Sequence, residues 1–260
     1  MQYEDYKRNY AIIPGREAAL EEFLKQDYQE LRGHKWRYRF SSNSEDALTW
    51  SCFDVLSSLP LPIKIIALDE IFEDAYQGQA KFLFKNLGLQ EDEIQIHIGK
   101  QYTGSTSKES TEVDASIELP DKLIFIEAKL YSVISMASPP KTPYDQIARK
   151  LRIGLDTPLK DAREFYFIFL DIAPLDRMTR KKVKDEDVAK TKGGFEDKWV
   201  SAWQFNYYKF GKDNSLNPLK KALEGIHIPP VESVAENMGW LTWSDLFKTV
   251  LRGMISNQTV

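Results

Sequence analysis

The chain has 260 residues and a formal net charge of −4, with 42% hydrophobic, 28% charged and 12% aromatic residues. This length suits one large domain or two small ones, and the composition excludes a disordered or collagen-like chain. The single cysteine, Cys52, excludes a disulfide framework and a thiolate zinc cluster, and the three histidines are widely separated in sequence. The charge balance argues against a polycation that coats nucleic acid, but it does not exclude an enzyme whose carboxylates bind metal ions.

The first ten residues, MQYEDYKRNY, contain no apolar segment of the kind found in signal peptides. The most apolar runs, 59–68 and 165–172, are much shorter than the roughly 20 residues of a membrane-spanning helix. We therefore expect a cytoplasmic protein that does not interact with membranes.

Helical patterns dominate the first third of the chain. Apolar residues at helical spacing, with Pro14 near the start and Gly33 after the end, predict a first helix. A second helix is expected over 44–59, ended by the prolines that follow it. The segments 66–76 and 81–87 are also expected to be helical.

Strand patterns follow. Alternating or continuous apolar residues predict four strands, over 93–102, 111–118, 123–131 and 165–172. Between the last two strands a helix is expected to open at Thr142 as the N-cap, with Pro143 in its first position. The first three strands are joined by short turns and the fourth by a helical crossover, which predicts an α/β fold with a mixed central sheet.

This order places a core at 43–173. We expect an N-terminal helical extension over 1–42 and C-terminal additions over 174–260, both packed on the core in one compact domain. The additions comprise a charged stretch, an aromatic stretch and a helix around 243–254.

Charged side chains gather at the end of the third predicted strand. Because side chains alternate along a strand, Glu127 and Lys129 share one face. A regular hairpin with Pro120-Asp121 at its tip pairs residues whose numbers add to 241, so Asp114 faces Glu127. Residues that face each other have Cβ atoms about 4.5–5.5 Å apart, where like charges are destabilising. Two carboxylates at that distance favour a cation between them, and hard oxygen ligands favour Mg²⁺.

Asp114, followed in the next strand by Glu127-Ala128-Lys129, resembles the signature of the PD-(D/E)XK nucleases, and the predicted order of elements agrees with that family. The resemblance covers about half the chain, and Val113 replaces the proline of the family signature. It implies an α-β-β-β-α-β restriction-endonuclease-like core, in which Asp114 and Glu127 bind Mg²⁺ and Lys129 assists the attacking water. Mn²⁺ is expected to substitute for Mg²⁺.

The resemblance also implies two supporting positions. Glu45, on the helix before the strands, matches a glutamate that often joins the metal site. Gln146, with Arg149 or Lys150 one turn later, matches a polar position on the helix after the lysine strand. Each has a structural alternative: Glu45 closes a capping box with Ser42, and Gln146 is an ordinary surface residue.

Other polar and aromatic residues have alternative roles as well. Glu112, which the same register places opposite Lys129, is expected to be its salt-bridge partner or a peripheral ligand. The basic run at 177–184 is a solvated helix face or a phosphate contact. Cys52 and the tryptophans are expected to pack in the core, although an exposed tryptophan could stack on a base; the four considered are Trp199, Trp203, Trp240 and Trp243.

The expected function is therefore a Mg²⁺-dependent deoxyribonuclease that cuts phosphodiester bonds within DNA, in a restriction- or repair-like role. Cutting both strands would favour a homodimer. The main alternative is a catalytically silent module of the nuclease fold that binds DNA or a protein partner. A glycosidase is a weaker alternative, because its two carboxylates should lie about 5–9.5 Å apart across a carbohydrate cleft and it requires no lysine.

Overall fold

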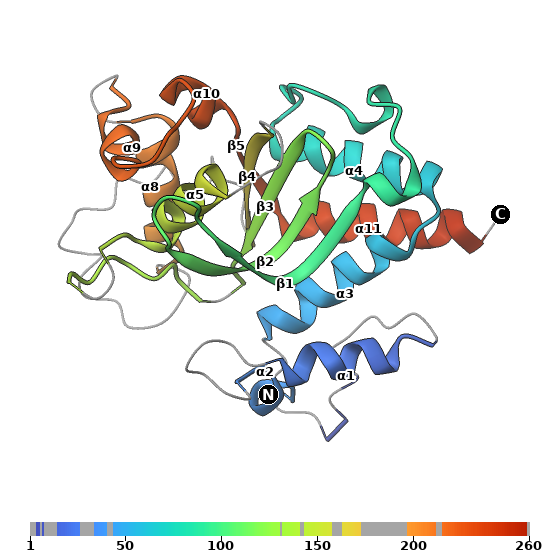
Figure 1. The fold of residues 1–260 in the computed structure, drawn as a ribbon. Helices are drawn as coiled ribbons and strands as arrows, with labels where there is room; N and C mark the ends of the chain where they lie inside the picture. The colour runs from blue at the N-terminus through green and yellow to red at the C-terminus, as the bar shows by residue number, and fades with distance from the viewer. Residues whose placement is uncertain are drawn as a thin grey trace.

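The computed structural model describes residues 4–5, 7, 15–26, 34–40, 44–130, 132–140, 143–157, 163–172, 197–211 and 215–258. It contains a five-stranded mixed sheet whose strands follow one another in chain order (Figure 1). The strands are β1 (Gln95–Thr103), β2 (Ser110–Glu118), β3 (Lys122–Ala128), β4 (Glu164–Asp171) and β5 (Met238–Thr242). The first three are antiparallel neighbours, and β3, β4 and β5 run parallel.

Helices cover both faces of this sheet (Figure 1). On one face lie α3 (Glu45–Ser58), α4 (Leu61–Ala75) and α11 (Trp243–Gln258). On the other lie α5 (Gln146–Asp156), α8 (Asp197–Lys209), α9 (Asn217–Ala222) and α10 (Val231–Glu236). Each layer has its own apolar cluster, because both faces of the central strands are apolar; Ile124 and Ile126 face one layer, and Leu123 and Phe125 face the other.

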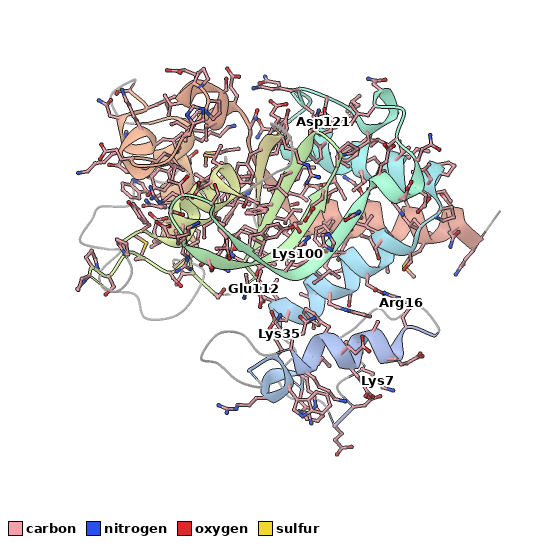
Figure 2. The ribbon with its side chains drawn as sticks, viewed as in Figure 1. Lys7, Arg16, Lys35, Lys100, Glu112 and Asp121 are labelled. Carbon is pink, nitrogen blue, oxygen red and sulfur yellow. The ribbon has the colours of Figure 1, made fainter. Side chains whose placement is uncertain are left out.

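The N-terminal residues form two short helices, α1 (Glu17–Lys25) and α2 (His34–Tyr38), beside the start of α3 (Figure 1). Leu20, Phe23 and Leu24 pack against Ala47 and Trp50 of α3. In Figure 2, Lys35 extends from this region toward Glu112 of β2, and their side chains form an ion pair of 2.8 Å. The predicted first helix was too long, because α1 ends at Lys25 and Gln26 has an extended backbone; residues 27–33 lie outside the described part of the chain.

The expected α/β class with a mixed sheet is confirmed, and the predicted strands lie within two or three residues of β1 to β4. The helix expected over 66–76 is confirmed, but α4 begins earlier, at Leu61, because Pro62 is compatible with the first turn of a helix. The expected helix over 81–87 was wrong. The segment 81–87 contains only the 3₁₀ turn η2 (Phe84–Asn86), and a second 3₁₀ turn, η3 (Glu91–Glu93), leads into β1.

Two helix caps also differ from expectation. Ser44 caps α3 by accepting a hydrogen bond from the Ala47 N–H group, whereas Ser42 lies outside the described residues. Asp145, not Thr142, caps α5, and its carboxylate accepts a hydrogen bond of 3.0 Å from Ala148 N–H. Thr142 also lies outside the described part of the chain. Within the described ranges, no helix combines the length and apolar character needed to cross a membrane.

A close approach between α5 and β4 depends on Gly154. A Cβ atom at this position would lie 2.0 Å from Cε2 of the buried Phe165 ring. Alanine is favoured over glycine in a helix by only about 1 kcal/mol, whereas overpacking typically costs about 1–3 kcal/mol. The steric cost of a methyl group at position 154 should therefore exceed its gain in helix propensity.

We expect Gly154→Ala to lower the free energy of unfolding by up to about 2 kcal/mol in urea denaturation, the overpacking cost of about 1–3 kcal/mol less the propensity gain of about 1 kcal/mol. Gly253→Ala in α11 is a matched control, because its Cβ would meet the end of the Leu59 side chain at 2.8 Å, which can move. A higher midpoint for Gly154→Ala than for the parent protein would show that the Phe165 ring relocates without cost, because only the propensity gain would remain.

Candidate active site

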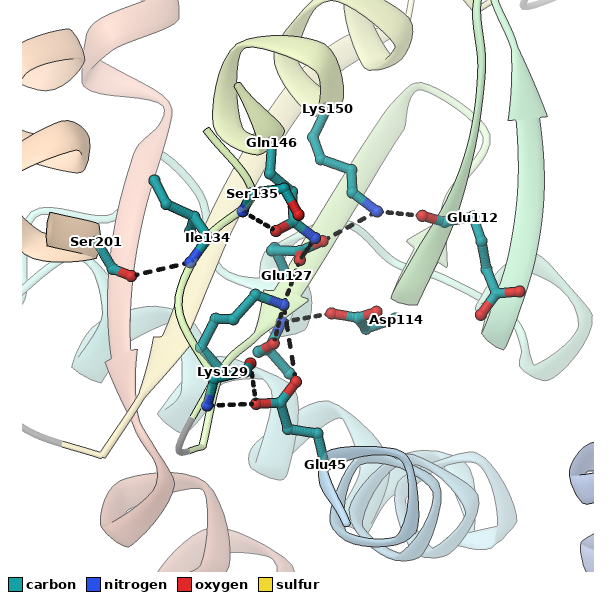
Figure 3. Close-up of polar contacts among 12 residues, drawn as sticks. Glu45, Glu112, Asp114, Glu127, Lys129, Ile134, Ser135, Gln146, Lys150 and Ser201 are labelled. Carbon is teal, nitrogen blue, oxygen red and sulfur yellow. Dashed lines mark hydrogen bonds and ion pairs between the residues drawn. The ribbon is translucent and has the colours of Figure 1, made fainter. Parts of the chain in front are cut away.

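Glu127 lies near the C-terminal end of β3, and its side chain is fully buried. Figure 3 shows this carboxylate between Lys129, Gln146 and Lys150. Lys129 Nζ donates a hydrogen bond of 2.8 Å to Glu127 Oε1, and the Gln146 amide donates to the same oxygen. Lys150 Nζ lies 2.9 Å from Oε2 as an ion pair, but without hydrogen-bond geometry. A buried carboxylate is thus compensated by two ammonium groups, as burial of a charge requires.

Lys129 follows β3 and is held from several sides. Its N–H group donates to Leu170 of β4, and its carbonyl accepts a hydrogen bond of 3.1 Å from the Trp243 indole of α11. Burial alone would lower the pKa of Lys129, but the carboxylates of Glu127, Asp114 and Glu45 outweigh burial and raise this pKa. The side chain is therefore a fixed cation at the end of the strand.

Asp114 lies across from this strand end. The β2–β3 register pairs Ala115 with Ile126, which is the predicted sum of 241, and the Ala128 N–H group donates a hydrogen bond of 2.7 Å to Asp114 Oδ2. Burial, and secondly the charge of Glu127, raise the pKa of Asp114 to about 7. Asp114 is therefore a carboxyl group poised to bind either a proton or a cation near neutral pH.

The pKa of Glu127 moves the other way. Burial would raise it, but the Lys129 and Lys150 ammonium groups have the larger effect and lower it below its ordinary value. The two carboxyl groups thus have separated pKa values although they lie on neighbouring strands. Such separation is common at catalytic sites, although structural ion-pair networks also produce it.

Glu45 begins α3 and contacts the chain that follows β3. Its Oε2 accepts hydrogen bonds of 2.8 Å from Leu130 N–H and 2.5 Å from the Ser132 hydroxyl, and its Oε1 lies 3.8 Å from Lys129 Nζ. Glu45 therefore holds the loop after the strand and adds negative charge beside Lys129. The expected capping box with Ser42 is replaced by the Ser44 cap.

The first turn of α5 supplies the other side of the site. Besides contacting Glu127, Gln146 accepts a hydrogen bond from Ser135 N–H, so its amide is oriented by the loop before the helix. Asp145, one residue earlier, accepts hydrogen bonds from Gln204 and Tyr208 of α8. The expectation of a polar contact from α5 is met by Gln146 and by Lys150, while Arg149 has no side-chain hydrogen bond or ion pair to the described residues.

Sequence reasoning missed some supporting residues. Asp145 is buried, and an aspartate directly before a helix is an N-cap signal that could have identified it. Ser135 and Trp243 had no comparable signal, because their contacts join segments far apart in the chain. Glu112 does not pair with Lys129, so the first of its two expected roles was wrong, and its role as a peripheral ligand stays a prediction. Its carboxylate binds Lys35, and its backbone carbonyl accepts a hydrogen bond from Lys150.

Other expectations have mixed outcomes. Cys52 is buried and its pKa is raised to about 12 by burial, which confirms a packing role. Trp240 and Trp243 are buried as expected, but Trp203 is 59% exposed and stacks on Tyr207, so its expected core position was wrong. The Trp199 side chain and the basic run at 177–184 lie outside the described residues.

The carboxylates fit a hard cation only in part. Glu127 Oε2 is buried and accepts no hydrogen bond, although the Lys150 ammonium group lies 2.9 Å from it. Asp114 has a pKa that repulsion from Glu127 helps to raise, which favours an added cation. Glu45 turns to the loop instead, and the described residues contain no group of three or more His, Cys, Asp or Glu side chains placed to hold a metal ion. Asp114 and Glu127 are thus the two residues that could bind Mg²⁺.

The arrangement of Asp114, Glu127 and Lys129 can therefore provide oxygen ligands and a fixed cation beside them. Comparison of the chain with protein-family models, with curated proteins and with solved structures finds no match.

Proposed function

We propose that this protein is a Mg²⁺-dependent deoxyribonuclease with a restriction-endonuclease-like core, which cuts phosphodiester bonds within DNA. The observation that carries the proposal is the pairing of a fully buried Glu127 with Lys129 at one strand end, across from Asp114. The same residues carry the resemblance to the PD-(D/E)XK nucleases. The element order also supports it: α3 and α4 precede β1, β2 and β3, and α5 connects β3 to β4.

Each residue has a role that follows from its surroundings. Asp114 and Glu127 would hold Mg²⁺, which supplies a Lewis acid and lowers the pKa of bound water. Lys129 carries a fixed positive charge because three carboxylates raise its pKa, so it can orient a water molecule by donating a hydrogen bond and offset negative charge that develops on a phosphate. Gln146 and Lys150 orient the Glu127 carboxylate, and Glu45 positions the backbone after Lys129.

The substrate assignment follows from the same resemblance. Two-strand cleavage by one such site per chain would require two copies, so we propose a homodimer for duplex cutting. A catalytically silent module would not need Asp114 beside Glu127, since repulsion from Glu127 helps to raise the pKa of Asp114 and a bound cation would relieve that repulsion.

The direct test is incubation of the purified protein with supercoiled plasmid, linear duplex and single-stranded DNA, in Mg²⁺, in Mn²⁺ and in chelator. We expect nicking or cutting in either metal, its loss in chelator and its return when metal is restored. Absence of cleavage of every substrate in both metals, by protein that binds DNA, would support the silent module and contradict the proposal.

A further inference from the structure

A cavity of about 680 Å³ lies where the ends of α4 and α8 meet α10 and β5. It adjoins the residues that lead into β5, whereas Glu127 and Lys129 lie at the C-terminal end of β3. Its volume is within the range of about 300–1,000 Å³ typical of small-molecule sites. The cavity is therefore separate from the candidate active site and has room for a ligand of its own.

In the part of the chain that the structure describes, the Lys209 side chain lines this cavity without forming an ion pair with a carboxylate. Its ammonium group donates hydrogen bonds to the backbone carbonyls of Ala235, at 3.2 Å, and Met238. Among the described residues, no carboxylate oxygen lies within 4.0 Å of Lys209 Nζ. Carbonyl groups use two of the three N–H donors but carry no negative charge, and the Glu236 carboxylate, which pairs with Lys81, acts on Lys209 only from beyond ion-pair distance. A partly buried ammonium group of this kind favours an anionic ligand.

The walls of the cavity are aromatic. Four aromatic side chains line it: Tyr76 at the end of α4, Phe205 of α8, Phe210 directly after α8, and Trp240 of β5. Phe205 and Trp240 pack edge to face with ring centroids 5.2 Å apart, so this wall is rigid. Phe210 is 61% exposed and forms the rim, although aromatic side chains of this size usually bury most of their surface. These walls favour a planar apolar ligand.

The charges around the cavity limit the charge of that ligand. Lys81 and Glu236 form an ion pair of 2.9 Å at the rim, and Glu232 lines the cavity as well. The lining thus contains two lysines and two glutamates, which balance to a formal charge of zero. A nucleoside di- or triphosphate would meet two carboxylates with no excess of cations, whereas a single negative charge needs only Lys209.

We propose that this cavity binds a small aromatic carboxylate, with its ring among the four aromatic side chains and its carboxylate accepting a hydrogen bond from Lys209. This inference is independent of the proposed nuclease activity, since it uses none of the residues of that site.

Binding should depend on pH in a defined way. Burial, with a smaller contribution from Lys81, lowers the pKa of Lys209 to about 8, although Glu236 raises it. The other ionisable groups that line the cavity are Glu232 and Tyr76, and burial raises the Tyr76 pKa well above its ordinary value. Because the anion requires the charged form of Lys209, affinity should be constant near pH 7 and should fall as pH rises above 8, with proton uptake on binding.

The test is isothermal titration calorimetry of the full chain with 2-naphthoate and with its neutral analogue 2-naphthalenemethanol. At pH 7 we expect 2-naphthoate to bind at least about tenfold more tightly, as for a charge-assisted hydrogen bond. Lys209→Met should reduce the affinity for 2-naphthoate to that for the alcohol. Lys220→Met, an exposed lysine of α9, is the matched control and should bind as the parent protein does.

Lys209 also links α8 to α10 and to the first residue of β5 through its hydrogen bonds. The Lys209→Met variant could therefore unfold for structural reasons. A second measurement therefore uses only the unaltered protein, titrated at pH 8.5 in buffers of different ionisation enthalpy. We expect the observed enthalpy to vary with the buffer, which reports proton uptake. Equal binding of the two probes, binding of neither, or an enthalpy independent of the buffer would each overturn the proposal.

Discussion

Glu127→Gln and Lys129→Met should each lower the rate of DNA cleavage by at least about 100-fold, the scale typical of lost catalytic groups. The two variants should differ in metal response. Glutamine at 127 removes a carboxylate that could hold Mg²⁺, so the rise in melting temperature on adding Mg²⁺ should also disappear. Methionine at 129 removes a cation and leaves both carboxylates, so the metal response should remain.

Stability has to be measured alongside activity. Glu127→Gln leaves the Lys129 and Lys150 ammonium groups without their buried partner, and removal of one member of a buried ion pair costs about 3–5 kcal/mol. Lys129→Met should cost less, because Glu127 keeps its contacts with Lys150 and Gln146. Rates should therefore be compared at a temperature where circular dichroism shows each variant to be folded.

Lys122→Met is the matched control for Lys129→Met. Lys122 begins the same strand, is buried to a similar degree, and pairs with the exposed Asp121 at the opposite end of β3. This variant should cleave DNA at a rate within about threefold of the parent protein, since an ion pair with an exposed carboxylate contributes little to stability. Unchanged cleavage in Lys129→Met, or equal loss in folded Lys122→Met, would contradict a role for Lys129 in the reaction.

The placement of Asp114 relative to Glu127 could be predicted because it depends on local rules. Alternating apolar residues define β2 and β3, and a two-residue tip fixes their register, which the Leu119–Lys122 hydrogen bond continues to the turn. The same rules place Glu127 and Lys129 on one face. No contact between distant segments is needed for either step.

Other features depend on contacts between distant segments and had no local signal. The β5 strand has only five residues, includes Gly239 and does not alternate, because both of its faces are buried between layers. It is a strand because it pairs with β4. The Lys35–Glu112 ion pair similarly joins residues far apart in the chain, so the register that placed Glu112 opposite Lys129 could not reveal its true partner.

The stability of the metal-free protein should fall as pH rises through the range in which Asp114 ionises. Its pKa is about 7 in the folded protein and about 4 in an unfolded chain. Between these values the folded state binds more protons, so the free energy of unfolding decreases with rising pH. Glu127 does not add to this pH dependence. Its pKa is lowered in the folded state, so its contribution to the free energy of unfolding is constant above about pH 5.

Asp114→Asn should remove this pH dependence. The asparagine side chain can still accept the hydrogen bond from Ala128 N–H, and it carries no charge beside Glu127. A shift of three pKa units corresponds to at most about 4 kcal/mol, and we expect about 1–3 kcal/mol of added stability at pH 8 in chelator, because Asp114 is only partly buried. The difference in free energy of unfolding between Asp114→Asn and the parent protein should shrink at pH 5, where the Asp114 carboxyl group of the parent protein is already protonated.

Added Mg²⁺ should reverse the order of stability. A ligand stabilises only the state that binds it, by about 2.7 kcal/mol at 100 times its dissociation constant, and the Asp114→Asn variant lacks one of the two carboxylates that could bind Mg²⁺. The melting temperatures of the parent protein and of Asp114→Asn, plotted against Mg²⁺ concentration at pH 8, should therefore cross. Glu118→Gln, on the same strand, is the control. Its carboxylate pairs with Lys100, so this variant should be destabilised and should keep the response to Mg²⁺. If the parent protein were more stable than Asp114→Asn in chelator at pH 8, and neither responded to Mg²⁺, Asp114 would serve only as a hydrogen-bond acceptor for Ala128.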